Sequence, residues 1–244
     1  MRRPDSGSLA WIAALALGWL TLAAVDYRAR DPDSRLYADI AARMSTAPAT
    51  GWVAPDFPPG WFMSGRFREH PAGLFVPAAL LARLGYPADE AAYALNALYQ
   101  VLTLVFLQRV AAFAVSGLEA RSLAWLAQLL PVAFTYRIRA NQEQALVLCL
   151  LVALYGTERA RRHPLWSMVT AAGLVGLLLV KGLFAAFGPA LCALWLLTTR
   201  RDGAPRSEPA AWAGLAAAIV AMGGAAALYE VLYRRATGEP FWSL

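Results

Sequence analysis

Charged residues are scarce in this sequence, and lysine and cysteine are nearly absent. Asp, Glu, Lys and Arg make up 16% of the chain and apolar residues make up 59%, whereas ordinary soluble domains have about 25% charged and about 45–50% apolar residues. The mean hydropathy is +0.46. This composition excludes an ordinary soluble domain and is typical of a polytopic membrane protein.

The placement of the basic and cysteine residues argues against a nucleic-acid partner and against a disulfide. The net charge is +6, but the arginines lie at the ends of apolar runs, where lipid headgroups and the positive-inside rule place them. We therefore expect membrane lipids and no nucleic acid as partners. Lys181 is the only lysine. Cys149 and Cys192 both lie inside apolar runs, so a disulfide is not expected.

The sequence also lacks several local motifs that define a site. It has no glycine-rich phosphate loop, no His and Cys cluster with metal-ligand spacing, no internal repeat and no low-complexity tract. Any chemistry must therefore come from polar side chains that the fold brings together.

The apolar runs predict an all-α membrane protein with about seven transmembrane helices. The run 9–25 is longer than the about 7–15 apolar residues of a signal peptide, so we expect an uncleaved first span. The run 72–86 is shorter than the roughly 20 residues that a spanning helix needs and predicts a juxtamembrane or re-entrant helix. The remaining predicted spans are 91–107, 122–136, 145–155, 165–180, 182–199 and 210–229.

Basic residues between these runs predict the orientation of the protein. If 72–86 does not cross, eight arginines fall in cytoplasmic loops and three basic residues in short outer loops, as the positive-inside rule prefers. The cytoplasmic set is Arg109, Arg121, Arg159, Arg161, Arg162, Arg200, Arg201 and Arg206, and the outer set is Arg137, Arg139 and Lys181. Residues 1–244 then form one membrane domain with a cytoplasmic N-terminus, and 26–71 is a long first outer loop that carries short juxtamembrane helices.

The polar stretch 31–71 carries most of the reactive side chains. Asp31 at an N-cap position and Pro32 at the first helical position predict the start of a helix. At about 100° per residue, one face of this helix carries Asp33, Tyr37, Ile40, Ala41 and Met44, and the opposite face carries Arg35, Asp39 and Arg43. A carboxylate on an apolar face must be paired, neutralised or used, so Asp33 is the first candidate functional residue.

Several polar residues that could belong to a site also have a purely structural explanation. Asp33 would interact favourably with the dipole at its helix N-terminus, and Tyr37 could simply pack. Asn141 with Gln144 three residues later is a capping-box arrangement. Lys181 at a membrane edge could extend its ammonium group to the interface.

Four polar motifs occur in order and on one predicted side of the membrane. They are Asp33 with Tyr37 four residues later, Glu69-His70-Pro71 before an apolar helix ending in Gly85, Arg139-Ala140-Asn141-Gln142-Glu143, and Leu179-Val180-Lys181-Gly182. Together these motifs resemble the GT-C membrane glycosyltransferases, in the branch of the protein O-mannosyltransferases and the bacterial lipid A aminoarabinose transferases. The resemblance covers nearly the whole chain.

The sequence departs from that branch at several positions. The family's Asp-Glu pair is Asp33-Ser34 here, the Lys of its Glu-Lys-Pro-Pro segment is His70, and the second Pro is Ala72. The chain resembles the membrane module of these enzymes without the usual C-terminal half.

The resemblance implies an enzyme of the plasma (inner) membrane that transfers a sugar from a polyprenyl-phosphate donor to an acceptor hydroxyl at the outer face. The acceptor would be a lipid, a protein or a glycan. The implied residue roles are Asp33 as the general base, Tyr37 as a substrate contact, Lys181, His70 and either Arg137 or Arg139 as holders of the phosphate, and Glu69 and Glu143 as groups that orient the acceptor. A divalent cation is a possible cofactor, with Glu69 and His70 as the candidate ligands.

The alternative hypothesis is a non-catalytic membrane subunit, for example a carrier, a flippase partner or a scaffold. A truncated fragment of a glycosyltransferase could also act as such a subunit. A transporter should carry ionisable residues or broken helices near the bilayer midplane. Here the mid-span positions are mostly apolar and the polar groups gather at one predicted face, which favours the enzyme.

Overall fold

Helices form nearly all the regular structure of the described residues. The computed structural model describes residues 32–61, 63–129, 139–199 and 208–242. In that part of the chain, β pairing is limited to an isolated bridge between Asp56 and Arg66. The all-helical architecture that the apolar runs predict is therefore confirmed.

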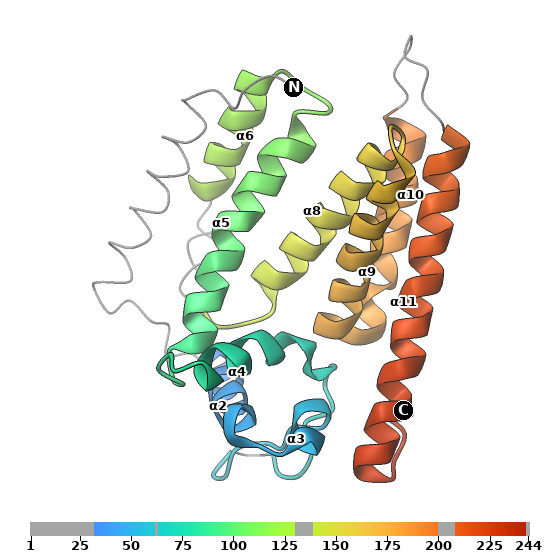
Figure 1. Ribbon diagram of the computed structural model, residues 1–244. Coiled ribbons are helices and arrows are strands. Elements are labelled where there is room, and N and C mark those ends of the chain that lie inside the picture. Colours follow the sequence, from blue (N-terminus) through green and yellow to red (C-terminus); the bar gives the residue numbers. More distant parts are fainter. Residues whose placement is uncertain (1–31, 62, 130–138, 200–207, 243–244) are drawn as a thin grey trace.

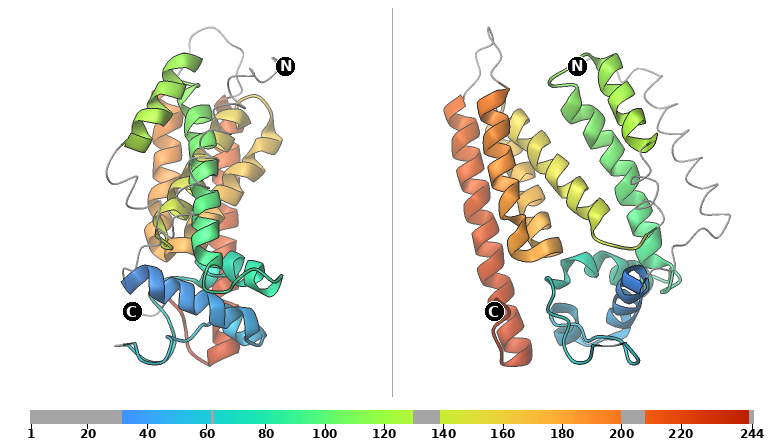
Figure 2. Two further views of the ribbon diagram at one scale, coloured as in Figure 1. Left: turned by 90° about the vertical axis from the view of Figure 1, so that its left-hand side faces the viewer. Right: turned by 180° about the vertical axis from the view of Figure 1, so that it is seen from behind.

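A layer of short elements lies across one end of a helix bundle (Figure 1). We call it the end layer, and it consists of α2 (Pro32–Thr46), α3 (Ala49–Val53), η1 (Ala72–Leu74) and α4 (Val76–Arg83). The bundle consists of α5 (Ala91–Ala111), α6 (Gly117–Leu129), α8 (Glu143–Ala160), α9 (Ser167–Lys181), α10 (Phe187–Thr198) and α11 (Glu208–Thr237). Figure 2 shows the same two-part arrangement from two further sides.

The end layer has its own apolar core. The face of α2 that carries Tyr37, Ile40, Ala41 and Met44 is buried, as the helical periodicity predicts. It packs against residues of α4 and of the preceding loop, including Phe67 and Phe75, which are each 1% exposed. The segment 72–86 forms η1 and α4 within this layer and is a short apolar helix, as predicted.

The bundle helices alternate in direction, so that the chain returns to the end layer three times after α5 leaves it (Figure 1). The turns η2 (Pro164–Trp166), between α8 and α9, and η3 (Gly182–Ala186), between α9 and α10, lie at opposite ends. Gly182 has a φ of +64°, a left-handed conformation that glycine adopts readily. Because the chain returns three times to this end, residues 139–143, Lys181 and the end of α11 all lie beside the end layer.

Close backbone contact joins α8 to α9. A Cβ atom at Gly173 would come within 2.5 Å of the Ala153 nitrogen and 2.6 Å of the Cys149 oxygen. These neighbours are backbone atoms and cannot turn aside. The glycine therefore allows the two helices to approach closely, as small residues do in membrane bundles.

The structure supports membrane-spanning helices, but the count of seven predicted spans is not confirmed. Three described stretches are long and apolar enough to cross a membrane: Ala91–Ala111, Pro164–Thr198 and Glu208–Thr237. The second stretch contains the chain reversal at η3, and its helices α9 and α10 have 15 and 12 residues, fewer than the roughly 20 that a span needs. The predicted first span 9–25 and the end of the predicted span 122–136 lie outside the described residues.

Aromatic residues of α11 connect the bundle to the end layer. The Tyr229 hydroxyl accepts a hydrogen bond from the Ala72 N–H at 2.9 Å and donates one to the Val53 carbonyl at 2.7 Å. Gly182 is the first residue of η3, directly after α9. A Cβ atom at this position would lie 3.3 Å from both the Pro71 ring and the Trp242 ring. The end of α9, where Lys181 stands, is thus packed between the loop that carries His70 and the segment that follows α11.

Candidate functional site

A buried tyrosine and a buried histidine form the centre of the candidate site. Tyr37 on α2 is 7% exposed and His70 is 3% exposed. His70 Nδ1 lies 3.2 Å from the Pro71 carbonyl oxygen and His70 Nε2 lies 3.4 Å from the Tyr37 hydroxyl. Because the carbonyl can only accept, Nδ1 carries the proton and the Tyr37 hydroxyl donates to Nε2.

The surroundings keep both of these side chains uncharged. The pKa of His70 is lowered to about 4, chiefly by burial and also by the nearby charge of Lys181, whereas the hydrogen bond to Pro71 acts in the opposite direction. Burial also raises the pKa of Tyr37, and the negative charges of Glu69, Asp33 and Glu143 add to that increase. At neutral pH, therefore, His70 is a neutral acceptor and is not a cation that could hold a phosphate by its charge.

Charged side chains from four separate segments surround this pair. Burial raises the pKa of Glu143 at the start of α8, the positive charges of Lys181 and Arg139 lower it, and Asp33 raises it. These mutual effects require the charges to lie near one another. The structure thus brings together seven of the eight candidate residues proposed from sequence: Asp33, Tyr37, Glu69, His70, Arg139, Glu143 and Lys181. The eighth, Arg137, lies outside the described residues.

Asp33 does not lie on a buried face, contrary to the sequence-based expectation. It is exposed in the first turn of α2, and the buried residues nearest to it in sequence are Ser34, Leu36 and Tyr37. Periodicity places Asp33 beside the apolar stripe, but no described element covers that side of the first turn. Its carboxylate is therefore at the solvent edge of the charged cluster, close enough to raise the pKa of Tyr37 and of Glu143.

The start of α8 also differs from the predicted capping box. The helix begins at Glu143, and the preceding Gln142 has a helical backbone with no side-chain cap. Asn141 is 6% exposed. The side-chain oxygens Asn141 Oδ1 and Glu143 Oε2 are buried and have no hydrogen-bond partner among the described residues. Such atoms are costly unless water or a ligand satisfies them, so this helix start is a place where a polar ligand would be stabilised.

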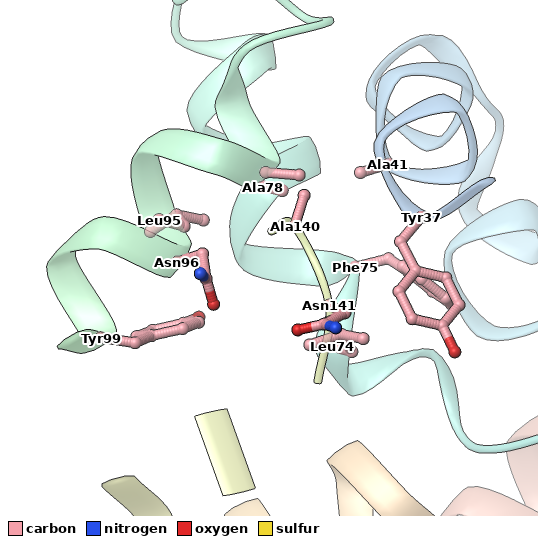
Figure 3. Close-up of a pocket in the computed structure, with 11 residues that line it drawn as sticks. Tyr37, Ala41, Leu74, Phe75, Ala78, Leu95, Asn96, Tyr99, Ala140 and Asn141 are labelled. Atoms are coloured by element: carbon pink, nitrogen blue, oxygen red, sulfur yellow. The ribbon is translucent and has the colours of Figure 1, made fainter. Parts of the chain in front are cut away.

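A small pocket adjoins the Tyr37 and Asn141 side chains. In Figure 3 the carboxamides of Asn96 and Asn141 extend into the space between α5 and the segment that precedes α8. The centre of a water-sized sphere can occupy a volume of about 20 Å³ in this pocket. The pocket therefore has room for about one water molecule and not for a sugar. The remaining lining residues are Tyr37, Ala41, Leu74, Phe75, Ala78, Ala92, Leu95, Tyr99 and Ala140.

Ser34 is a residue of the site that the sequence motifs did not identify. It is 0% exposed, and its Oγ accepts a hydrogen bond from the Ala140 N–H at 3.0 Å. The helical spacing contains a signal for it, because Ser34 shares a face with Tyr37, Ala38 and Ala41. Its partner 106 residues away could not be found from that spacing.

The described residues do not form a metal site of the usual kind. Among them, no group of three or more His, Cys, Asp or Glu side chains is placed to hold a metal ion. Both ring nitrogens of His70 are directed at protein atoms, one at Pro71 and one at Tyr37. The Glu69 and His70 pair proposed as cation ligands is therefore not arranged for that role in this structure.

The arrangement combines the groups that a displacement reaction with a phosphate leaving group requires. An exposed carboxylate can take a proton, and cationic side chains nearby can bind a departing phosphate. The cluster lies where the helix bundle meets the end layer (Figure 1).

Comparison with known proteins gives one match. No curated protein and no solved structure matches the chain. Residues 69–224, more than half of the sequence, match the family described as dolichyl-phosphate-mannose-protein mannosyltransferase. This match agrees with the glycosyltransferase superfamily that the four motifs resemble. The chain belongs to the dolichyl-phosphate-mannose-protein mannosyltransferase family.

Proposed function

We propose that the protein is an integral-membrane glycosyltransferase that transfers a sugar from a polyprenyl-phosphate donor to an acceptor hydroxyl at the outer face of the membrane. The name of its family makes a mannosyl group the first sugar to test. The observation that carries the proposal is the gathering of acidic and basic side chains from four segments around Tyr37 and His70. Motifs far apart in the sequence meet at one end of the bundle.

In the proposed reaction the acceptor oxygen attacks the anomeric carbon of the sugar. The bond between that carbon and the phosphate oxygen breaks, and polyprenyl phosphate leaves with the bonding electrons. The Asp33 carboxylate takes the acceptor proton. Lys181 and Arg139 bind the leaving phosphate, while Glu69 and Glu143 orient the acceptor.

The structure suggests a role for His70 other than phosphate binding. With a pKa of about 4 it carries no charge at neutral pH, and its Nε2 accepts the Tyr37 hydroxyl proton. In our proposal His70 therefore fixes the orientation of Tyr37. Tyr37 keeps its proton because burial and the surrounding carboxylates raise its pKa.

The buried polar residues within the bundle are a weaker argument for a carrier. Asn96, Gln100 and Thr103 are buried along α5, so the interior of the bundle is not entirely apolar. All three side chains are uncharged, whereas coupling ions and charged substrates usually require ionisable groups there. The charged groups gather at the end layer instead, which favours the transferase.

The direct test is sugar transfer by the purified protein in lipid nanodiscs. Farnesyl-phosphate-linked mannose would be the donor, serine and threonine peptides and a lipid hydroxyl would be the acceptors, and released farnesyl phosphate would be measured. Asp33→Asn keeps the size of the side chain but cannot take the proton, so we expect the rate to fall by about 10²- to 10⁴-fold.

Asp39→Asn is the matched control for this experiment. Asp39 is exposed on the same helix, and an exposed surface charge contributes at most about 1 kcal/mol. Its transfer rate should stay close to that of the unaltered protein. Equal rates in the two variants would refute Asp33 as the base, and the absence of transfer by the unaltered protein with every acceptor would count against the transferase.

A further inference from the structure

The segment 139–142 carries Arg139 and leads directly into Glu143, yet it has no regular secondary structure. Ala140 is 4% exposed and Asn141 is 6% exposed. Irregular backbone that is buried needs hydrogen-bond partners from outside the segment, because its own N–H groups have none in a helix or sheet. The position of the segment therefore depends on the groups that supply those partners.

Ser34 supplies one such partner from α2. Its Oγ accepts the Ala140 N–H at 3.0 Å in a fully buried location. Ser34 directly follows Asp33, and Ala140 directly follows Arg139, so this single hydrogen bond joins the helix turn of the proposed base to the segment of a proposed phosphate ligand. The two carboxylates Asp33 and Glu143 are also close enough for Asp33 to raise the Glu143 pKa.

We propose that Ser34 is a positioning residue, whose hydroxyl fixes the Arg139–Glu143 segment against α2 and so sets the placement of Arg139 relative to Asp33. Its effect on donor binding rests on the proposed function, whereas its effect on the segment does not. Ser34 occupies the position where the resembling family has the Glu of its Asp-Glu pair. In this chain a neutral side chain there binds a backbone N–H.

Amide hydrogen exchange tests the positioning role without any ligand. In Ser34→Ala the Ala140 N–H stays in place but loses its acceptor, and loss of one hydrogen bond predicts about tenfold faster exchange in peptides covering 140–145. Ser34→Thr keeps the hydroxyl and should exchange at nearly the original rate. Ser45→Ala is the matched control, because Ser45 Oγ donates to the Ala42 carbonyl within the same helix. Unchanged exchange in Ser34→Ala would overturn the proposal.

Farnesyl phosphate binding tests whether Ser34 acts through Arg139. Ser34→Ala should weaken binding about fivefold in the unaltered background and have no further effect when Arg139 is replaced by Gln. A purely structural loss would instead add to the effect of Arg139→Gln, so additive effects would overturn the proposed link.

The two measurements distinguish failure of this inference from failure of the proposed function. If the unaltered protein does not bind farnesyl phosphate, the proposed donor site is refuted, while the exchange rate of 140–145 still decides the positioning role. If Ser34→Ala does not fold, Ser34→Cys repeats the exchange comparison, since a thiol of similar size is a weaker acceptor. Exchange in Ser34→Cys equal to that of the unaltered protein would overturn the proposal.

Discussion

Lys181 is the cation whose position bears most directly on the proposed donor. It ends α9, is partly exposed, and has no carboxylate within ion-pair distance among the described residues. Its charge nevertheless lowers the pKa values of His70 and Glu143, so it lies beside the centre of the site. A cation without an ion-pair partner in the described part of the chain is suited to bind an external anion.

We predict that Lys181→Met weakens binding of farnesyl phosphate by about 10- to 100-fold, because a hydrogen bond to a charged group contributes about 1.5–3 kcal/mol. Methionine keeps the apolar stem, so folding and insertion should remain normal. Arg43→Met is the control, since Arg43 is exposed on α2 and should leave the affinity unchanged. Equal affinity of Lys181→Met and the unaltered protein would mean that Lys181 only extends to the membrane interface.

His70 should make the stability of the protein depend on pH. Its pKa is about 4 in the folded protein and about 6.5 when unfolded, so between these values the unfolded state binds more protons and stability rises with pH. The stability that the neutral ring provides is complete above about pH 6.5 and is lost as the pH falls towards 4. The total loss should be about 3 kcal/mol.

The melting temperature in detergent at pH 7.5 and at pH 5 measures this effect. We predict a larger fall for the unaltered protein than for His70→Gln, whose amide oxygen can still accept from Tyr37 but does not titrate in this range. Comparing the two proteins removes the contribution of other groups such as Glu143. The same fall in both proteins would show that His70 is not the group responsible.

At the scale of secondary-structure elements, a buried arginine holds three helices together at the end of the bundle that is opposite the end layer. The Arg161 side chain is fully buried and donates to the carbonyls of Leu196 and Thr199 at 2.8 and 3.0 Å. Its guanidinium lies 3.6 Å from Glu158 and 3.3 Å from Glu208. It thereby joins α8 to the end of α10 and to the start of α11.

Removing this guanidinium takes the nearby positive charge away from the buried Glu158 carboxylate, and breaking a buried ion pair costs about 3–5 kcal/mol. We therefore predict that Arg161→Met lowers the melting temperature strongly, whereas Arg162→Met, at the exposed next position, changes it little. Thermal unfolding in detergent measures both. Similar melting temperatures for the two variants would show that the network contributes little to stability.

The sequence predicts the helical elements well where a strong local signal exists. The α2 stripe of Tyr37, Ile40, Ala41 and Met44 is buried as periodicity indicates, and the shortness of the run 72–86 predicts a helix that stays in the end layer. The exposure of Asp33 was not predictable, because it depends on which elements cover the first turn of α2. The predicted spans 165–180 and 182–199 coincide with α9 and with η3 plus α10, and the hydropathy of these runs does not decide whether each one crosses the membrane.

The candidate site was predictable as a set of motifs and not as a geometry. The order of the polar motifs along the chain brought Lys181 and Glu143 to the same predicted side as Asp33. The bond from Ser34 to Ala140 and the neutral state of His70 depend on burial, which no local pattern in the sequence encodes. Both follow from the way the loop around His70 and the start of α8 pack against α2.

At the scale of the whole molecule, the candidate site and the turn that carries Arg161 and Arg162 lie at opposite ends of the bundle (Figure 1). Asp33, His70, Glu143 and Lys181 lie at the end layer, whereas the turn 161–166 between α8 and α9 lies at the other end (Figure 1). Loops that carry an excess of arginine face the cytoplasm in most membrane proteins. With that turn in the cytoplasm, the whole candidate site would be extracytoplasmic, and this is the orientation that we propose.

This orientation predicts different accessibility of two exposed positions to an impermeant thiol reagent in intact cells. Cys149 and Cys192 would first be replaced by Ala, and a single cysteine would then be placed at Ser64 in the loop between α3 and η1 or at His163 in the turn between α8 and α9. Both positions are exposed, so burial will not hide either cysteine. We expect Ser64→Cys to be labelled in intact cells and His163→Cys only after the membrane is permeabilised. Labelling of His163→Cys alone in intact cells would invert the orientation, and the proposed site would then face the cytoplasm.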